Sequence, residues 1–202
     1  MKLILVIDHE DSFTYNLVHD LEEIDEVKVV HYEDIHENTI LDLNPRLVLL
    51  SPGPGHPIDK KNSIKIVNQI KGTVPIFGVC LGFQIIVQAL GGQIVEANRP
   101  IHGHIELVTH DSKTIYTNLD QPLQVTRYHS LVADREHFPN ELEITARSKS
   151  GEIMSCRHQT LPIEGVQYHP EAILTTQGKH ILRNFLDYYK WSDKDDETSC
   201  TF

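Results

Sequence analysis

Apolar runs alternate with amphipathic segments through the first half of the chain. Residues 3–7 are continuously apolar, which is typical of a strand buried on both faces of a parallel sheet. The next segment has apolar residues three or four positions apart, which predicts a helix that Asp11 or Ser12 would cap. Its apolar face consists of Phe13, Leu17, Leu21 and Ile24.

The same alternation continues to about residue 92. Further strands are predicted at residues 27–30, 47–50 and 74–79. A helix is predicted around Ile64, Val67 and Ile70, and another around Ile85 and Ala89 that ends at the glycine pair 91–92. Strands that alternate with helices at this spacing predict right-handed crossovers and a parallel sheet covered on both faces.

The pattern changes after residue 92, where short strands and turns replace the helices. Strands are predicted at 105–108, 115–116, 123–126, 143–146, 153–156 and 163–167. A hairpin turn is predicted at 149–151, and a final amphipathic helix at 181–189. The whole pattern predicts one α/β domain over residues 1–191, with a mixed, largely parallel central sheet, helices on both faces, and an antiparallel region in the second half. Residues 192–202 are predicted to form a frayed acidic tail.

Composition narrows the class of protein. Hydrophobic residues make up 40% of the chain and charged residues 23%, which excludes a disordered chain. No apolar run approaches the roughly 20 residues that a membrane helix needs. The three cysteines, an odd and sparse set, are typical of reduced thiols and predict a cytoplasmic protein: Cys80, Cys156 and Cys200.

The net charge of −11 is concentrated in one part of the chain. Between Asp8 and Asp42 there are twelve carboxylates and one cation, Lys28, whereas acids and bases balance elsewhere. An anionic face repels phosphate backbones, so nucleic acid is excluded as an expected partner. A solvated face that aids solubility is the favoured explanation, and a docking surface for a basic partner is the alternative.

The segment from Pro75 to Gln84 carries the most informative pattern. A predicted strand runs into Gly78, Cys80 and Gly82, and a helix follows at once, as in the elbows that present a catalytic nucleophile. The positive end of the helix dipole favours a thiolate at such a position. The alternative is that Cys80 is simply a buried small hydrophobe. The flanking glycines, together with polar Gln84 one turn later, favour the nucleophile.

One of the thirteen histidines has a context that suits proton transfer. His169 ends a predicted strand, and Pro170 then turns the chain away from the sheet. In an extended backbone His169 and Glu171 project to the same side, so the carboxylate can orient the imidazole. His-Pro-Glu is a weak signal alone, but with the Cys80 elbow it predicts a Cys–His–Glu triad.

A third candidate element is the loop SPGPGHP at residues 51–57, directly after a buried strand. Its place puts it at the carboxyl edge of the sheet, where α/β proteins bind ligands and where the Cys80 elbow also lies. Its prolines and glycines hold backbone N–H groups that can stabilise a developing oxyanion. Alone, this loop would be interpreted as a surface turn.

Five motifs in a fixed order carry a resemblance to a known family: DSFTYN at 11–16, SPGPG at 51–55, GVCLGFQ at 78–84, RYHSL at 127–131 and GVQYHPE at 165–171. With them the chain resembles the class I, triad-type glutamine amidotransferases, whose fold is flavodoxin-like. The first motif makes it similar to the branch that serves anthranilate synthase and aminodeoxychorismate synthase. The resemblance covers the chain from about residue 7 to residue 181.

The resemblance implies a role for each matching residue. Cys80 would attack the side-chain amide of L-glutamine, and His169, oriented by Glu171, would protonate the leaving nitrogen and later activate water. The backbone N–H groups of Gly55 and Leu81 would form the oxyanion hole. Six residues match positions that bind glutamine: Gly53, Pro54, Gly55, Gln84, Ser130 and Leu131.

The resemblance also implies partners. The ammonia would pass directly to a chorismate-binding synthase subunit, because free ammonia in water is quickly protonated. The chain shows no Walker-type or dinucleotide motif, and we expect it to hold no cofactor or metal, with chorismate and Mg²⁺ bound only by the synthase subunit. We expect low glutaminase activity without the partner.

Four residues depart from the family pattern without touching the triad: Phe83, Ile101, His104 and Ala172. Ile101 and His104 lie in a segment expected to face the partner. His102 and His104 are two residues apart on a predicted strand and could mimic a metal pair, but with no third ligand in view a strand surface or interface is favoured.

Two other functions stay open. A stand-alone thiol hydrolase acting on γ-glutamyl compounds could use the same fold and triad. A catalytically idle regulatory subunit is a third hypothesis, against which the intact Cys80, His169 and Glu171 argue. The motifs do not distinguish an anthranilate-forming partner, for tryptophan, from an aminodeoxychorismate-forming partner, for folate.

Overall fold

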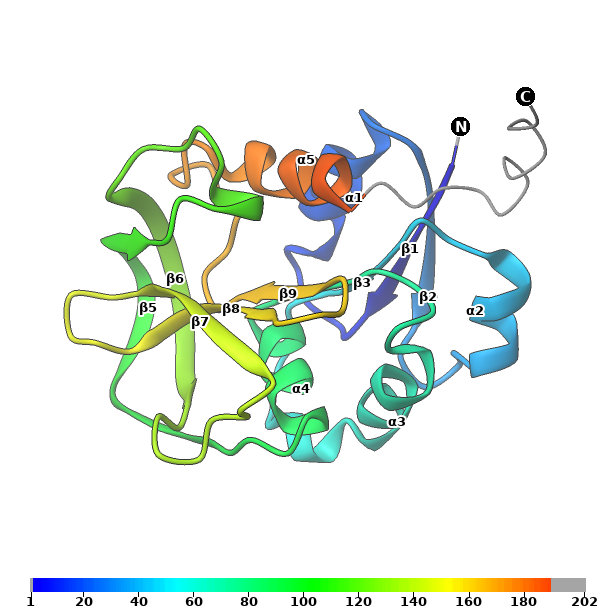
Figure 1. The fold of residues 1–202 in the computed structure, drawn as a ribbon, viewed down its shortest axis with the longest axis horizontal. Coiled ribbons are helices and arrows are strands. Elements are labelled where there is room, and N and C mark those ends of the chain that lie inside the picture. Colours follow the sequence, from blue (N-terminus) through cyan, green and yellow to red (C-terminus); the bar gives the residue numbers. More distant parts are fainter. Residues whose placement is uncertain (1, 190–202) are drawn as a thin grey trace, which may run out of the picture.

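A computed structural model describes residues 2–189, and the predicted tail at 192–202 lies outside them. Within this part of the chain one sheet runs through the molecule in the order β2-β1-β3-β4-β9-β8-β7-β5-β6 (Figure 1). Its strands are β1 (Leu3–Asp8), β2 (Glu26–His31), β3 (Leu47–Leu50), β4 (Ile76–Val79), β5 (Ile94–His110), β6 (Leu123–Ala133), β7 (Leu142–Arg147), β8 (Ile153–His158) and β9 (Ile163–Val166).

The sheet has a parallel half and an antiparallel half. Strands β2, β1, β3, β4 and β9 pair in parallel, and β9, β8, β7, β5 and β6 pair in antiparallel fashion. The α/β fold with a mixed sheet and an antiparallel second half is therefore confirmed. Strand β9 belongs to both halves, because it lies parallel to β4 on one side and antiparallel to β8 on the other.

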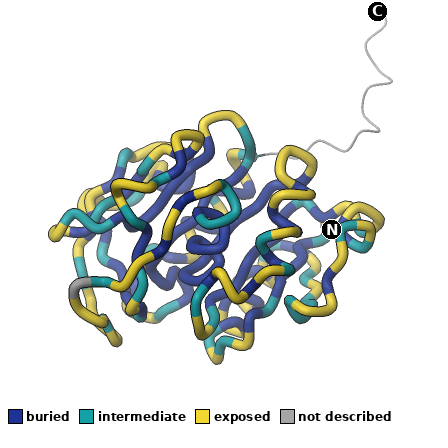
Figure 2. Tube along the Cα trace, turned by 90° about the horizontal axis from the view of Figure 1, so that it is seen from below, coloured by how far each residue is buried: buried dark blue, intermediate teal, exposed yellow. Residues whose placement is uncertain are grey.

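Helices cover both faces of the parallel half (Figure 1). On one face lie α1 (Thr14–Glu22) and α5 (Gly178–Tyr188), and on the other α3 (Lys61–Ile70) and α4 (Leu81–Ala89), with α2 (Glu37–Leu43) beyond β2. Alternate residues of β1 enter different cores, Ile4 with α1 and α5, and Leu5 with α3 and α4. The strands at the centre of the molecule are buried on both sides (Figure 2), which explains their continuously apolar sequences.

Two local predictions in the first half are wrong. The first helix begins at Thr14 with Phe13 as its N-cap, and no side chain caps it. Asp11 instead accepts a hydrogen bond from the backbone N–H of Phe13 (2.7 Å), so its carboxylate stabilises the turn before the helix. The fourth strand is also shorter than predicted, since it begins at Ile76 rather than at residue 74.

The second half departs further from the prediction. Residues 105–108 belong to the longer β5, whose pairing with β6 is interrupted near Ile101 and Gly103, and Pro100 and Gly103 hide this strand from a pattern search. Residues 115–116 lie in a short 3-10 helix, η2 (Thr114–Tyr116), which packs against α5. Helix α2 was not predicted because it buries only Ile40. A second 3-10 helix, η1 (Pro57–Asp59), follows the glycine-rich loop.

The pairing of β9 with β4 decides where the candidate residues lie. Gly78 is opposite Gly165, and Val79 is opposite Val166. Because parallel strands end at the same edge, the segment after β4, with Cys80, and the segment after β9, with His169, leave the sheet side by side. Two motifs far apart in the sequence are thereby brought to one place.

Candidate active site

Cys80 occupies a strained elbow between β4 and α4. Its backbone has φ 52° and ψ −102°, a conformation that costs a residue with a side chain on the order of 1–3 kcal/mol. A hydrogen bond from its N–H to the carbonyl of Val166 (2.8 Å) holds it there. A Cβ on Gly82 would lie 2.2 Å from the carbonyl oxygen of Leu50, so only glycine permits this turn. The predicted elbow is therefore present.

His169 and Glu171 are paired as predicted. Nδ1 of His169 lies 2.5 Å from Oε1 of Glu171, and both residues are buried. Since the carboxylate accepts from Nδ1, the imidazole presents Nε2 on its other side, and this nitrogen is buried with no hydrogen-bond partner among residues 2–189. The rings of Phe13 and Tyr128 pack edgewise against His169, with centroid distances of 5.8 and 5.3 Å.

The electrostatic surroundings favour the protonated form of His169. Burial alone lowers the pKa of an imidazole, but Coulombic attraction to Cys80 and then the interactions with Glu171 outweigh burial, and the pKa of His169 lies well above its usual value. The pairing of β4 with β9 places the segments that carry Cys80 and His169 at the same edge of the sheet. A thiolate facing an imidazolium is the charge state that suits a nucleophile and a general acid.

A small cavity of about 160 Å³ opens beside Cys80. It brings together every residue predicted to bind glutamine and both predicted oxyanion donors, Gly55 and Leu81. The complete lining is Gly53, Pro54, Gly55, Cys80, Leu81, Gln84, Tyr128, His129, Ser130 and Leu131. These residues come from the loop after β3, from the start of α4 and from β6, so three chain segments close around one volume.

His9, which the sequence analysis did not single out, supports the loop after β3. Its Nε2 lies 2.9 Å from the hydroxyl of Ser63, and its backbone N–H donates to the hydroxyl of Ser51 (2.8 Å). A Cβ on Gly53 would approach Cβ of His9 to 2.6 Å, so the loop packs directly against this residue. Burial, with a contribution from Lys60, lowers the pKa of His9 to about 3. Its neutral ring therefore holds the loop across the physiological pH range.

The side-chain amide of Gln84 has one orientation. Its Nε2 donates to the carbonyl of Leu131 (3.2 Å) and to Oε1 of Gln167 (3.1 Å). Its own oxygen, which neither bond uses, is thus left as an acceptor at the cavity wall. Gln167 was missed in the sequence, although it lies two residues before His169 and so shares its side of an extended chain. Its Nε2 lies 3.7 Å from Sγ of Cys80.

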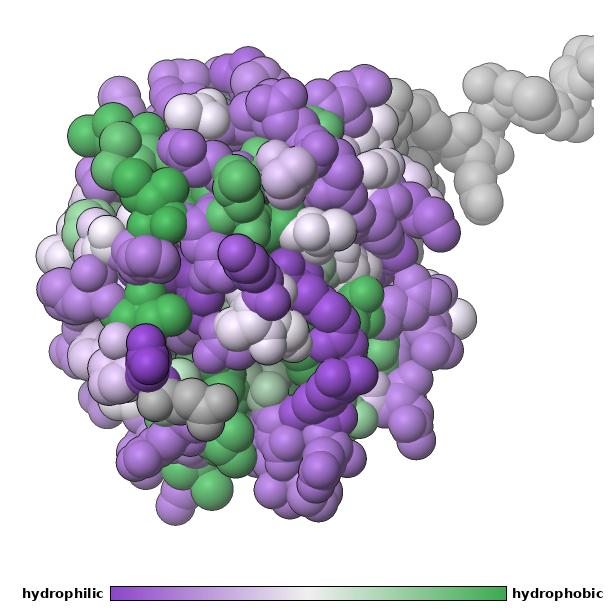
Figure 3. Space-filling view, turned by 90° about the vertical axis from the view of Figure 1, so that its left-hand side faces the viewer, coloured by the Kyte–Doolittle hydropathy of each residue, from purple (hydrophilic) through white to green (hydrophobic). Residues whose placement is uncertain are grey.

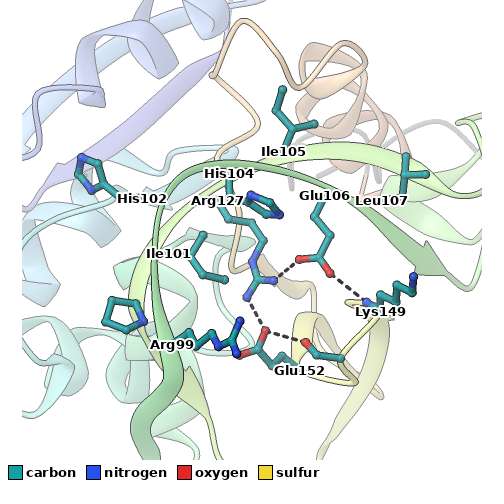
Figure 4. A pocket seen from close by; sticks show the side chains of 12 residues that line it. Arg99, Ile101, His102, His104, Ile105, Glu106, Leu107, Arg127, Lys149 and Glu152 are labelled. Carbon is teal, nitrogen blue, oxygen red and sulfur yellow. Dashed lines mark hydrogen bonds and ion pairs between the residues drawn. The ribbon is translucent and has the colours of Figure 1, made fainter.

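A larger cavity of about 810 Å³ lies on the outer side of β5 and β6 (Figure 4). Arg127 reaches into it, almost fully buried, and forms ion pairs with Glu106 and with Glu152 (2.6 Å). The molecular face that carries these strands has apolar patches between hydrophilic side chains (Figure 3). Ile105 and Leu107, both exposed, line the cavity.

Arg127 also connects this cavity to the smaller one. Its Nε donates to Nε2 of His129 (3.0 Å), and Nδ1 of His129 lies 3.0 Å from the carbonyl oxygen of Leu131. Burial and the charge of Arg127 lower the pKa of His129 to about 4. The ring is therefore neutral, accepts from Arg127 and donates to Leu131, the carbonyl that also receives the Gln84 amide.

The remaining candidates lie away from the Cys80 site. Cys156 is fully buried in β8, and burial raises the pKa of its thiol, so it is an inert core residue. Cys200 lies outside the described residues. His102, on β5, packs edgewise against the ring of Tyr128 at 5.5 Å. Across residues 2–189 no three His, Cys, Asp or Glu side chains come together in a way that could hold a metal ion.

Comparison with known proteins identifies the family. The family described as glutamine amidotransferase class-I matches residues 5–188. The chain therefore belongs to the class I glutamine amidotransferases. A solved structure from Thermoplasma acidophilum, named for a GMP synthase, has a TM-score of 0.84 and 26% identity, with 94% of each chain covered.

Within the family, the chain is similar to the second components of two synthases. It is 48% identical to aminodeoxychorismate/anthranilate synthase component 2 of Bacillus subtilis, over 93% of this chain and 97% of that protein. It is 45% identical to anthranilate synthase component 2 of Pseudomonas aeruginosa, over 91% and 94%. These relatives confirm the resemblance seen in the motifs. Among the described residues no helix is long and apolar enough to cross a membrane.

Proposed function

We propose that this chain is the glutaminase component of a chorismate-aminating synthase, and that Cys80, His169 and Glu171 are its catalytic residues. The observation that carries the proposal is that a strained cysteine and an oriented amide line one small cavity, while a buried His–Glu pair follows the strand that lies beside the strand leading to this cysteine. Family membership and the names of the two relatives support glutamine as the substrate.

The proposed reaction has two steps. The Cys80 thiolate attacks the side-chain amide carbon of glutamine, and the C–N bond breaks as protonated His169 gives its Nε2 proton to the leaving nitrogen, which departs as ammonia. Water then loses a proton to Nε2 and attacks the γ-glutamyl thioester. The C–S bond breaks, glutamate leaves and the thiolate is restored. The N–H groups of Gly55 and Leu81 stabilise the oxyanion of both steps.

Each binding residue has a chemical task in this proposal. The free oxygen of Gln84 accepts from the α-ammonium group of glutamine, and the backbone of Ser130 and Leu131 completes the recognition of its amino-acid end. The loop at Gly53–Gly55 lines the same cavity, contributes to glutamine binding and carries the oxyanion donor Gly55. All the chemistry uses groups of this chain, so the proposed reaction needs neither a metal nor a cofactor.

A partner subunit that consumes the ammonia is part of the proposal. Ammonia released into water is protonated and loses its nucleophilicity, so an interface that hands it over directly is required. The names of the relatives as component 2 support a synthase component as this partner. Chorismate and any Mg²⁺ would bind to that component. Its product, anthranilate or aminodeoxychorismate, is to be identified from the native complex supplied with chorismate and glutamine, since only anthranilate gives its characteristic fluorescence.

The test is Cys80→Ala in the complex with the synthase subunit. Formation of product from glutamine should fall by at least about 10³-fold, because no thioester can form, while formation from ammonium salt should persist. Cys200→Ser serves as the matched control and should retain both activities. Loss of the ammonium-dependent activity as well would contradict the ammonia-donor function. Rapid hydrolysis of γ-glutamyl compounds by the isolated chain would instead support a stand-alone hydrolase.

A further inference from the structure

We propose that Gln167 is a positioning residue that donates a hydrogen bond to the Cys80 sulfur and joins this sulfur, through Gln84, to the residues that bind the amino-acid end of glutamine. The inference deepens the proposed function and rests on it for the identity of the substrate. The contact between Gln167 and Cys80 can be tested without glutamine.

The direction of each hydrogen bond follows from the chemistry of the groups. A backbone carbonyl only accepts, so the Leu131 oxygen, 3.2 Å from Gln84, must receive an N–H of that amide. The same Nε2 lies 3.1 Å from Oε1 of Gln167, which therefore accepts. Hence the NH₂ group of Gln167 points the other way, toward Sγ of Cys80 at 3.7 Å. A flip of either amide would place two acceptors or two donors against each other.

The side-chain amides of Gln84 and Gln167 are buried, which strengthens their hydrogen bonds. Gln167 is fully buried and Gln84 is 3% exposed, so water does not compete for their amides. A second bond supports the backbone of Gln167, whose N–H donates to the carbonyl of Met154 on β8 (2.8 Å). The backbone of Gln167 is therefore held by the sheet, and its side chain contacts the sulfur from a fixed position. An N–H donor at this place stabilises the thiolate more than the neutral thiol.

The chain of contacts extends beyond the two amides. The Leu131 carbonyl that orients Gln84 also accepts from His129, which in turn accepts from Arg127 at the larger cavity (Figure 4). A continuous series of hydrogen bonds thus runs from the ion pairs of Arg127 to the sulfur of Cys80. In this series Gln167 is the last member and the one that contacts the nucleophile.

The decisive measurement is the pH dependence of Cys80 alkylation by iodoacetamide, which reports the thiolate population and needs no oxyanion hole. All variants carry Cys200→Ser, and Cys156 is fully buried, so that the signal comes from Cys80. Gln167→Met keeps the length of the side chain and removes its donor. Gln93→Met, at an exposed glutamine, is the matched control.

We expect the alkylation midpoint of Gln167→Met to move upward by about one pH unit, because a hydrogen bond to a charged group stabilises it by about 1.5 kcal/mol. The control should leave the midpoint unchanged. Gln84→Met should move it in the same direction but less, since Gln167 then loses its anchor and keeps its donor. If Gln167→Met folds and its alkylation midpoint is unshifted, the proposal is overturned. If Gln167→Met does not fold, Gln84→Met takes its place, and an unshifted midpoint in that variant overturns the proposal.

Steady-state kinetics in the complex provide the second readout. In Gln167→Met, kcat for glutamine should fall about tenfold, whereas KM should rise less than about threefold because Leu131 still holds Gln84. A rise in KM with unchanged kcat would overturn the role at the sulfur. A shifted alkylation midpoint in a protein that does not hydrolyse glutamine would support the Gln167 contact and refute the proposed function, so the two failures are distinguishable.

Discussion

The parallel and antiparallel halves of the sheet are stabilised by different interactions. In the parallel half, β3 and β4 consist of apolar residues and glycine, all buried, and they pack between two layers of helices. In the antiparallel half the buried residues include Arg127, Arg157 and Glu164. The two arginines form ion pairs with carboxylates, and Glu164 accepts hydrogen bonds from the hydroxyl groups of Thr114 and Tyr189.

The antiparallel half contains two such ionic clusters. Arg157 pairs with Asp111 (2.7 Å) and Glu143 (2.8 Å), and it donates to Thr114, which in turn donates to Glu164. Burial raises the pKa of Glu164 to about 8, against the opposing effects of its hydrogen bonds to Thr114 and Tyr189. Arg127 forms the other cluster, with Glu106 and Glu152.

The difference separates two tasks of the site. The nucleophile Cys80 follows β4 in the parallel half, called here the apolar half, where tight packing holds a strained turn. The β6 wall of the glutamine cavity belongs to the antiparallel half, called here the ionic half, where hydrogen bonds set the orientation of each group. We therefore expect substitutions in the apolar half to act mainly on folding, and substitutions in the ionic half to act mainly on substrate binding.

The largest effect is expected from Gly82→Ala in the apolar half. The new methyl group would lie 2.2 Å from the Leu50 carbonyl oxygen, so the free energy of unfolding should fall by at least about 3 kcal/mol. Gly91→Ala is the control, because its methyl group meets nothing within 4 Å and only its φ of +88° is unfavourable, at about 1 kcal/mol. Urea unfolding measures both. Equal losses would show that packing at the elbow is not tight.

A smaller effect on stability but a clear effect on binding is expected from Arg127→Met. Removal of one partner of a buried ion pair costs about 3 kcal/mol, less here because Glu106 and Glu152 keep some contact with water. Without Arg127 the His129 ring loses its donor, so KM for glutamine should rise severalfold with little change in kcat.

The exposed Arg135→Met is the matched control for this variant, and the same kinetic assay of the complex compares the two. If KM stays at the wild-type value while stability falls, the ionic half contributes to folding alone, and the division of tasks is refuted.

The third prediction concerns the stability of the protein at acidic pH. The pKa of His9 is about 3 in the folded protein, below its ordinary value of 6.5, so its contribution to stability is present above pH 6.5 and is lost as the pH falls toward 3. Between pH 7 and pH 5 the loss from this residue is about 2 kcal/mol. Unfolding curves of His9→Gln should therefore depend less steeply on pH over this interval. His36→Gln, at an exposed site, should keep the wild-type slope.

Local patterns in the sequence determined much of this protein. Glycines around Cys80 predicted the elbow, because a tight turn excludes other residues there. The spacing of His169 and Glu171 predicted their pairing, because alternate residues of an extended chain share a side. Continuous apolar runs predicted the buried strands of the parallel half.

Patterns failed where distant contacts replace local preference. Irregular β5 was seen only in part, because its stability comes from pairing with β6 rather than from alternation within its own sequence. Residues 115–116 were predicted as a strand, although α5 packs on them as a short helix. Asp11 was expected to cap a helix and instead bonds within the preceding turn.

Only the tertiary structure decided which residues surround the sulfur. The motifs predict that Cys80 and His169 meet, but no local pattern places β9 beside β4, since strand order depends on the packing of both helical layers. That order brings Gln167 to Cys80 and aligns it with Gln84, two amides whose orientation is set by a carbonyl on β6. Hydrogen-bond direction is a property of a group and its neighbours in space, and for these residues the neighbours are far away in the chain.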